Sequence, residues 1–502
     1  MRDSHALTDY EAVRPSRRLE PRGGAAAAPP DAPAEAETPG AGQGGRARRK
    51  AKGPGGRATA AAAEVRAEPW VARRAHAFAY AGLLLFTAFI YFRPYELFSL
   101  PALSDGAQYL AVLTLMAFLP AQLAAEGNLT ARPREVNLVL LLLVAALLSI
   151  PLAVSPFEAW ESSLEFGKVV LMFVVMVNVV RTERRLRWMI LLALAASVVM
   201  SVAALNDYRA GRLAVAGTRV KGMIGGLFEN PNDLALHLVT MVPLAVCLML
   251  GRRGPLKKLL YGLTALLMAA TVVVTFSRGG FLGLMLASGV LAWKLARRNR
   301  VLVVALAAVA LAVFVVAAPS EYGGRLSTIF GGDATGSAGA RQELFWRSLI
   351  VSLRFPLFGV GLGNFHFKSI REQVSHNSYT QVSAEMGMAA LAVYCLFMLV
   401  PLRRLRAIER ETLGVKEHAR FYYLAVGLQA SIAGYMVSSF FASVAHLWYV
   451  YYLVGYAVCV RRLYALGAHG EAQKGGARRA AGGAAAGDAA GAGPRAAPAG
   501  GA

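Results

Sequence analysis

Charge is scarce in this sequence of 502 residues: only 17% are Asp, Glu, Lys or Arg, whereas 56% are hydrophobic. So small a charged fraction excludes an ordinary soluble protein of this length. Apolar stretches of roughly 20 residues, the length that a helix needs to cross a bilayer, recur along most of the chain. The composition therefore predicts an integral membrane protein with many spans.

Cysteine is scarce as well. Cys247, Cys395 and Cys459 all lie inside apolar stretches, without the spacing of a metal site. This pattern excludes a disulfide framework and indicates small hydrophobic side chains. A cleavable signal peptide is not visible either, because the first apolar run begins only near Ala77.

Apolar runs are missing at both ends of the sequence. Residues 1–69 are rich in Ala, Gly, Pro, Arg and Glu, and residues 463–502 are mostly Ala and Gly with scattered charges. Neither segment can bury a core, so we expect a disordered tail on each side of a membrane domain at 70–462.

The net charge is +23, but the Lys and Arg residues fall mainly in the tails and in short clusters between apolar runs. Such clusters are typical of topology determinants and not of a nucleic-acid-binding surface, so no nucleic-acid partner is expected.

Twelve apolar runs predict an all-α fold with about twelve transmembrane helices. They lie at 76–92, 107–125, 136–154, 164–180, 188–205, 233–250, 257–275, 280–296, 301–318, 381–401, 421–439 and 443–460.

The basic loops all fall on one side of this arrangement. They contain Arg73-Arg74, Arg132 and Arg134, Arg181–Arg187, Arg252-Arg253 with Lys257-Lys258, Lys294–Arg300, Arg403–Arg406 and Arg461-Arg462. By the positive-inside rule this side is the cytoplasm, and both tails share it.

Two loops on the opposite side carry cations against this trend, at 206–232 and at 319–380. Cations there do not help insertion. The second loop, between spans 9 and 10, is also unusually long, and long loops in compact proteins are commonly functional. We expect a partly helical cap over the periplasmic face.

The first polar cluster runs from Arg219 to Asn230-Pro231-Asn232-Asp233, at the start of a predicted span. Asn232 or Asp233 would satisfy the free N–H groups of that helix. Capping does not account for Arg219, and a cation beside a helix N-terminus makes a natural anion site.

The second cluster, Thr275–Gly280, is a tight connection between two spans on the same face. An arginine so close to the hydrocarbon region is costly unless it is paired or lines a wet cavity, so Arg278 is a functional candidate. The alternative is that its side chain snorkels to the interface.

The third cluster lies in and after the long loop. Arg341 comes first, the run Gly359–Gly363 is expected to turn against the bundle, and His376 has the chemistry of a general base near neutral pH. Glu385 would orient His376 or balance its charge. Alternatively, His376 is a polar surface residue and Glu385 stabilises the N-terminus of the next helix.

Together these clusters resemble the O-antigen ligase and O-antigen polymerase superfamily of bacterial membrane glycosyltransferases. The resemblance covers about residues 76–462. It rests on Arg219 with Asn230-Pro231-Asn232, Ser277-Arg278-Gly279, Arg341 and Trp346 leading to Pro356–Gly361, and His376–Tyr379 followed by Glu385-Met386-Gly387.

The resemblance implies transfer of a glycan from an undecaprenyl diphosphate carrier on the periplasmic face of the inner membrane, without a metal or another cofactor. It implies that His376 is the general base and that Arg219 binds the donor diphosphate. Arg341 and Arg278 both fit the second arginine, and Arg341 is favoured because it shares a loop with His376.

The acceptor stays open. It would be the lipid A core for a ligase, a second lipid-linked glycan for a polymerase, or a Ser or Thr side chain for a protein O-oligosaccharyltransferase. A transporter of lipid-linked glycans or other solutes is the alternative from another class. Transport would require charges in the middle of spans and repeated half-bundles. Glu165 and Lys168 lie near span ends and no repeat is evident, which favours an enzyme.

Overall fold

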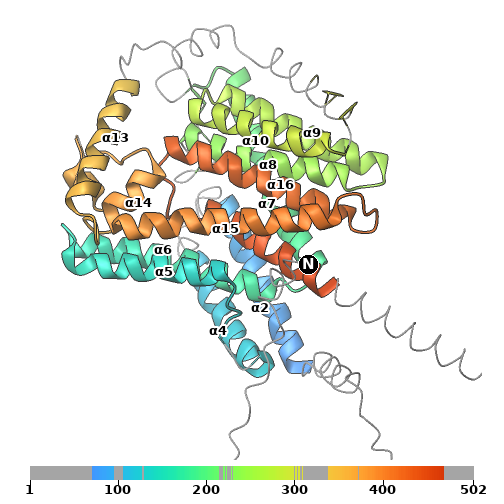
Figure 1. Cartoon of the computed structure of the whole chain (residues 1–502), viewed down its shortest axis with the longest axis horizontal. Helices are drawn as coiled ribbons and strands as arrows, with labels where there is room; N and C mark the ends of the chain where they lie inside the picture. The colour runs from blue at the N-terminus through green and yellow to red at the C-terminus, as the bar shows by residue number, and fades with distance from the viewer. Residues whose placement is uncertain are drawn as a thin grey trace, which may run out of the picture.

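The computed structural model describes residues 70–94, 106–126, 129–213, 230–298, 337–370 and 372–467, with isolated positions at 219, 220, 222, 228, 300, 301, 304, 305 and 308. These residues form helices joined by short connections (Figure 1). The predicted all-α membrane fold is therefore confirmed. The tails at 1–69 and 468–502 lie outside the described residues, as does residue range 309–336.

The long helices are α2 (Trp70–Phe92), α4 (Gly106–Glu126), α5 (Arg134–Ser149), α6 (Pro156–Val179), α7 (Glu183–Arg209), α8 (Pro231–Leu250), α9 (Pro255–Val274), α10 (Arg278–Ala296), α13 (Ser337–Arg354), α15 (Met388–Thr412) and α16 (Ala419–Ser438). The shorter ones are η4 (Ile150–Leu152), η5 (Phe365–Lys368), α14 (Ser378–Met386) and η6 (Ser439–Phe441). Residues 448–467 are helical too.

Within the described residues, ten helices are long and apolar enough to cross a membrane, namely every long helix except α13. They correspond to predicted spans one to eight, ten and eleven. The helix at 448–467 matches the predicted run at 443–460, and it continues five residues past the predicted domain boundary at 462. The predicted run at 301–318 falls almost wholly outside the described residues.

The predicted span at 381–401 is wrong at its start. Gly387 interrupts the run with a φ of 91°, so that α14 ends before it and the membrane-spanning α15 begins after it. A Cβ at this position would overlap the carbonyl groups of Pro356 and Leu357. Glycine is therefore required both by the left-handed backbone and by the close approach of the long loop.

Helix starts follow from short sequence signals. Proline occupies the first turn of α6, α8 and α9, where its missing N–H has no helical partner in any case. Ser155, Thr182 and Ser277 cap α6, α7 and α10 by accepting from backbone N–H groups.

The connections separate into two ends of the bundle, and contacts link connections of the same end. One end, which we call the site end, comprises the α5–α6 and α9–α10 connections, residues 337–387 and residues 439–447. Two hydrogen bonds link these segments: Ser155 N donates to Asn364 Oδ1 (2.7 Å) and Ser378 Oγ donates to Ala442 O (2.7 Å). At the opposite, basic end, Arg420 pairs with Glu183 (3.0 Å). For the connections joined by these contacts, the grouping agrees with the predicted alternation of loops.

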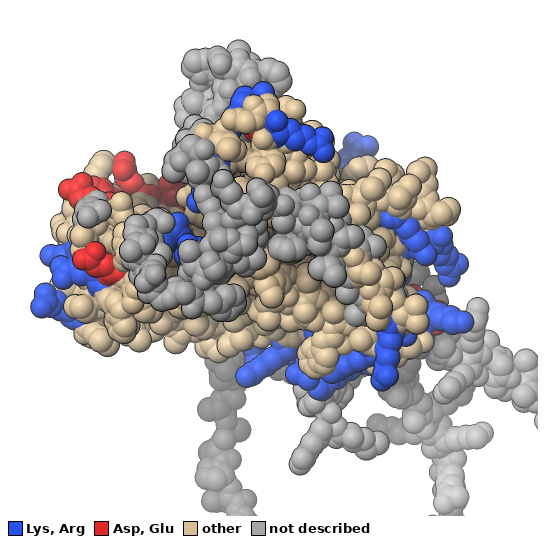
Figure 2. Space-filling model, turned by 90° about the horizontal axis from the view of Figure 1, so that it is seen from above, with Lys and Arg blue, Asp and Glu red and all other residues tan. Residues whose placement is uncertain are grey.

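The surface charge differs between the two ends. Figure 2 shows Asp and Glu gathered, together with some Lys and Arg, at the end that carries α13 and α14 in Figure 1, while the opposite end carries mainly Lys and Arg. On this face the acidic residues therefore gather at the site end.

α8 and α16 form the centre of the bundle, since 72% of the residues in the most apolar 18-residue stretch of α8 and 67% of those in that of α16 are buried. α10 packs closely on α16, because a Cβ at Gly283 would overlap Ser438 Oγ and approach Gly434 O. Ser438 Oγ also donates to Gly279 O (3.2 Å). These contacts fix the first turn of α10 beside η6, at the site end.

Candidate functional site

Arg219 is tied to the first turn of α8 and to the α9–α10 connection. Its Nε donates to Thr275 O (3.0 Å) and its Nη2 donates to Asn232 Oδ1 (2.9 Å). Ser277 Oγ donates to the same Asn232 oxygen (2.9 Å). Asn232 therefore joins the two sequence clusters that contain Arg219 and Arg278.

The expectation that Asn232 or Asp233 caps α8 is wrong. The cap is Asn230, whose Oδ1 accepts from Asn232 N (2.9 Å). Pro231 sits at the first helical position, so the residue before it is the one with the extended backbone that a cap needs. This leaves the Asn232 side chain available to hold Arg219.

The α9–α10 connection places Arg278 at the exposed first position of α10. Two residues earlier, Phe276 has a φ of 51°, a left-handed conformation that costs a non-glycine residue roughly 1–2 kcal/mol. The bonds from Arg219 to Thr275 O and from Ser277 to Asn232 hold this turn in place. Strained turns of this kind are concentrated at functional sites.

Arg341 lies in the second turn of α13, half-buried and close to Arg278. Burial, and then the positive charge of Arg278, lower the pKa of Arg341. Two guanidinium groups within electrostatic range repel each other, so an anion bound between them would relieve the repulsion. The structure thus places within electrostatic range of each other the two arginines that fit the second position, of which the sequence favoured Arg341.

His376 lies on the connection that leads into α14, and it also has a left-handed φ of 51°. Burial, and then the charge of Arg341, lower the pKa of His376. Its imidazole is therefore neutral near pH 7, the form that can accept a proton. Arg278, Arg341 and His376 form one group of side chains at the site end, which we call the cationic cluster.

Asn377 follows His376 and caps α14, since its Oδ1 accepts from Tyr379 N (2.9 Å) and Thr380 N (3.1 Å). Its Nδ2 is buried without a hydrogen-bond partner among the described residues. A buried amide donor left unpaired is costly, and a bound ligand would satisfy it.

Glu385 does not meet His376 as expected. Its buried carboxylate is hydrogen-bonded to His446, with 3.2 Å between Glu385 Oε2 and His446 Nε2. The backbone around it is clasped by the loop, because Val360 N donates to Ala384 O (2.9 Å) and Gly361 N donates to Glu385 O (3.0 Å). The predicted turn of the Gly359–Gly363 run against the bundle is confirmed by these bonds.

His446 was not predicted from the sequence as a partner of Glu385. It lies between η6 and the helix at 448–467, and its ring meets Phe166 edge to face at 5.5 Å. The only signal in the sequence is one imidazole among apolar residues at the start of a predicted span. Nothing in its spacing points to Glu385, 61 positions earlier.

The segment 438–444 holds two helix N-termini beside each other. Ser438 Oγ bonds to Gly279 O in the first turn of α10, whereas Ser378 Oγ at the start of α14 accepts from Val444 N (3.0 Å). The bond from Ser277 to Asn232 adds the N-terminus of α8. Each N-terminus carries a partial positive charge, so the helices reinforce the potential of the arginines toward an anion.

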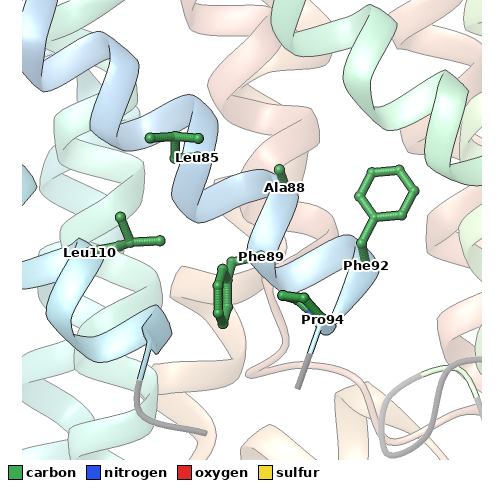
Figure 3. Close-up of a pocket in the computed structure, with 6 residues that line it drawn as sticks. All are labelled: Leu85, Ala88, Phe89, Phe92, Pro94 and Leu110. Carbon is green, nitrogen blue, oxygen red and sulfur yellow. The ribbon is translucent and has the colours of Figure 1, made fainter. Parts of the chain in front are cut away.

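A wholly apolar groove of about 300 Å³ lies elsewhere, between α2 and α4. Figure 3 shows its lining residues, which are Leu85, Ala88, Phe89, Phe92, Pro94 and Leu110. None of the predicted site residues lines it, and its side chains offer no donor for a sugar or a phosphate. Across the described residues, no group of three or more His, Cys, Asp and Glu side chains could hold a metal ion.

Comparison with known families finds a match between residues 263–395 and the family model described as O-Antigen ligase. The matched segment contains Arg278, Arg341, His376 and Glu385, while Arg219 precedes it. The predicted resemblance is confirmed by this match, over a shorter stretch than 76–462. The match indicates an enzyme of the ligase or polymerase type that acts on lipid-linked glycans. Among curated proteins, none matches the chain.

Proposed function

We propose that this protein transfers a glycan from an undecaprenyl-diphosphate-linked donor to a sugar hydroxyl, at the periplasmic face of a bacterial inner membrane. The observation that carries the proposal is the convergence of Arg278, Arg341 and His376 at one end of the bundle, inside the segment that matches the O-antigen ligase family. The clusters of Lys and Arg in the basic-end loops support assigning that end to the cytoplasm and the site end to the periplasm.

The arginines supply the diphosphate site. Guanidinium groups bind phosphate oxygens through two parallel hydrogen bonds, and these bonds strengthen as negative charge builds up on the leaving diphosphate. Arg278 and Arg341 both take this role, so the choice between them made from the sequence is unnecessary. Burial lowers the pKa of Arg341 and the charge of Arg278 lowers it further, and this repulsion between the two arginines favours anion binding.

His376 supplies the base. Its neutral imidazole takes the proton of the acceptor hydroxyl while the acceptor oxygen forms a bond to the anomeric carbon. The bond from that carbon to the diphosphate oxygen breaks in the same step, and undecaprenyl diphosphate leaves with the electron pair. The result is a single displacement with inversion.

Arg219 acts at the back of this site. Its bonds to Thr275 O and Asn232 hold the strained turn that presents Arg278, and its charge adds to the field at the diphosphate. Glu385 and His446 act as a positioning pair. Their hydrogen bond joins the end of α14 to residues 439–447, the segment in which Ala442 accepts a hydrogen bond from Ser378 at the start of α14. The pair therefore holds α14, the helix that follows His376, in place.

The experiment is glycan transfer by the purified protein from a lipid-linked donor. His376→Ala should abolish turnover, while His366→Ala should retain it, because His366 lies ten positions earlier on the same loop but bonds to Gly363 O (2.9 Å). Glu385→Gln should lower turnover without abolishing it. Near-normal turnover by His376→Ala would remove the general-base role, and movement of intact donor without transfer would indicate a transporter.

The acceptor class is read out in cells. A strain that lacks the gene should lose either the attachment of polysaccharide chains to lipid A core or the elongation beyond one repeat unit. Loss of glycosylation on proteins alone, with surface polysaccharide unchanged, would replace the sugar acceptor with a Ser or Thr side chain.

A further inference from the structure

Aromatic side chains from two segments gather at the site end. Within α13, Trp346 meets Phe345 edge to face, with 5.8 Å between the ring centres. Phe345 in turn meets Phe440 of η6, with 5.9 Å between the ring centres. Trp346 and Phe440 are 55% and 46% exposed. We call Phe345, Trp346 and Phe440 the aromatic platform.

The aromatic platform adjoins the cationic cluster through α13 and α14. Arg341 and Phe345 lie four residues apart on α13, so their Cβ atoms are about 5–6 Å apart on one face of the helix. On the other side, Phe440 meets the ring of Tyr379 at 6.3 Å. Tyr379 is in the first turn of α14, three residues after His376. The aromatic rings therefore lie between the helix that carries Arg341 and the helix that follows His376.

The start of α10 borders the same rings. A Cβ at Gly279 would lie 2.6 Å from Phe441 Cβ, so only glycine allows this approach. Gly279 directly follows Arg278, and the Phe441 ring meets that of Phe440 at 5.4 Å. All three elements that supply the cationic cluster therefore adjoin the aromatic platform or its neighbour in η6.

The part of α13 that carries Trp346 faces water. Gln342 and Glu343, four and three residues before Trp346, are exposed on the same side of the helix. A carboxylate in hydrocarbon is costly, which places this side of the helix outside the hydrocarbon region. Large aromatic rings that are open to water beside a polar site are typical of a surface that a ligand covers.

A pyranose ring has the chemistry that such a surface recognises. One face of the sugar presents C–H groups, whose slight positive charge is attracted to the negative face of an aromatic ring. The rim of the sugar carries hydroxyl groups, which need polar partners. Asn377, two residues before Tyr379, has a buried Nδ2 without a partner among the described residues, and a substrate oxygen would satisfy it.

We propose that the aromatic platform binds a pyranose ring of the glycan, with the C–H face of the sugar against Trp346 and Phe440. The inference rests on the proposed function for the presence of a glycan, and it adds the surface that holds the sugar beside the reacting groups. The sugar belongs to the donor or to the acceptor, and the test distinguishes the two.

The first test measures binding without turnover, on purified full-length His376→Ala protein. N-bromosuccinimide oxidises exposed tryptophans, and mass spectrometry of peptides measures the oxidation at each position. The lipid-linked glycan donor, the lipid A core or both should slow oxidation of Trp346 several-fold, and the protecting compound identifies the sugar. Trp293, also 55% exposed but near the basic end of α10, is the internal control and should be oxidised at an unchanged rate. Undecaprenyl diphosphate without a glycan should not protect Trp346.

The second test separates an aromatic contact from a merely apolar one. Trp346→Phe keeps an aromatic face, so KM for the protecting substrate should stay near the wild-type value. Trp346→Leu is apolar without that face, so this KM should rise about fivefold with little change in kcat. Ile350→Ala, at a 49% exposed position one turn further along α13, is the matched control and should leave KM unchanged.

Three results would overturn the proposal: no protection of Trp346 by either glycan, equal protection by undecaprenyl diphosphate alone, or the same KM in Trp346→Phe and Trp346→Leu. The last two would assign the surface to lipid. Failure of the proposed function gives a different result. Transfer by the wild type without protection of Trp346 refutes the aromatic platform alone, whereas protection without transfer refutes the proposed transfer and leaves sugar binding in place.

Discussion

His376 owes its low pKa to two causes that substitution can separate, namely burial and the charge of Arg341. The same arginine is proposed to bind the donor phosphate. One residue thus connects the binding of the leaving group with the protonation state of the base, so that its two contributions should be separable in a pH profile.

Replacing Arg341 with Gln should move the acidic limb of the pH profile of kcat/KM to higher pH. Without the neighbouring charge the pKa of His376 rises, so the imidazole becomes protonated, and inactive as a base, at a higher pH than in the wild type. Arg341→Lys keeps the charge, so it should keep the limb near its wild-type position while lowering the rate, since Lys does not bind phosphate bidentately. Arg354→Gln, at the end of the same helix, is the control. An unmoved limb in Arg341→Gln would show that His376 is not the titrating base.

Individual residues were predictable from the sequence where polar chemistry interrupts an apolar pattern. Arg278 was predicted as an arginine close to the hydrocarbon region, Arg341 as a cation in a loop opposite the basic side, and His376 as an imidazole in the same loop. The pairing of Glu385 with His446 was not predictable, because His446 lies inside an apolar run and only the folded bundle brings the two together. The role of Asn232 was misjudged because Asn230, Asn232 and Asp233 are chemically equivalent as caps.

At the scale of elements, α14 is the short helix that carries the site, although nine residues are too few for a helix to be stable on its own. Its start is anchored by Ser378 to Ala442 and Val444, and its end is clasped by the Pro356–Gly361 turn. The sequence showed only one apolar run here. Glycine is common in membrane helices, so the break at Gly387 is visible only once the loop lies against it.

Asn377 allows the two roles of the α14 N-terminus to be distinguished. Asn377→Ser keeps an oxygen that caps the helix but removes the buried Nδ2 donor, so stability should be unchanged. If Nδ2 donates to the bound substrate, turnover should fall roughly tenfold to hundredfold, the usual effect of losing a hydrogen bond to a charged group. Thermal unfolding and the transfer assay are measured on the same preparation. Full activity in Asn377→Ser would limit Asn377 to capping.

At the scale of the whole molecule, the positive-inside pattern predicted which connections share an end, and contacts within each end bear this out. Hydropathy and loop charge are sufficient for this, since a helix crosses the bilayer once and each connection must return to one of two aqueous faces. How α8 and α16 come to lie at the centre was not predictable, since periodicity in a membrane helix says little about which neighbour it meets.

The assignment of the two ends to opposite sides of the membrane can be tested with single cysteines. Cys247, Cys395 and Cys459 lie on spans and form no disulfide, so replacing them with Ala gives a background without thiols. In that background Glu372→Cys, exposed in the loop before His376, should react with a membrane-impermeant maleimide in intact spheroplasts. Glu417→Cys, exposed between α15 and α16 at the basic end, should react only after the membrane is opened. The two positions are on either side of α15, a single span, so they must differ in access if α15 crosses the bilayer. Equal labelling would contradict the crossing, and the reverse pattern would place the cationic cluster in the cytoplasm, where the proposed periplasmic transfer could not occur.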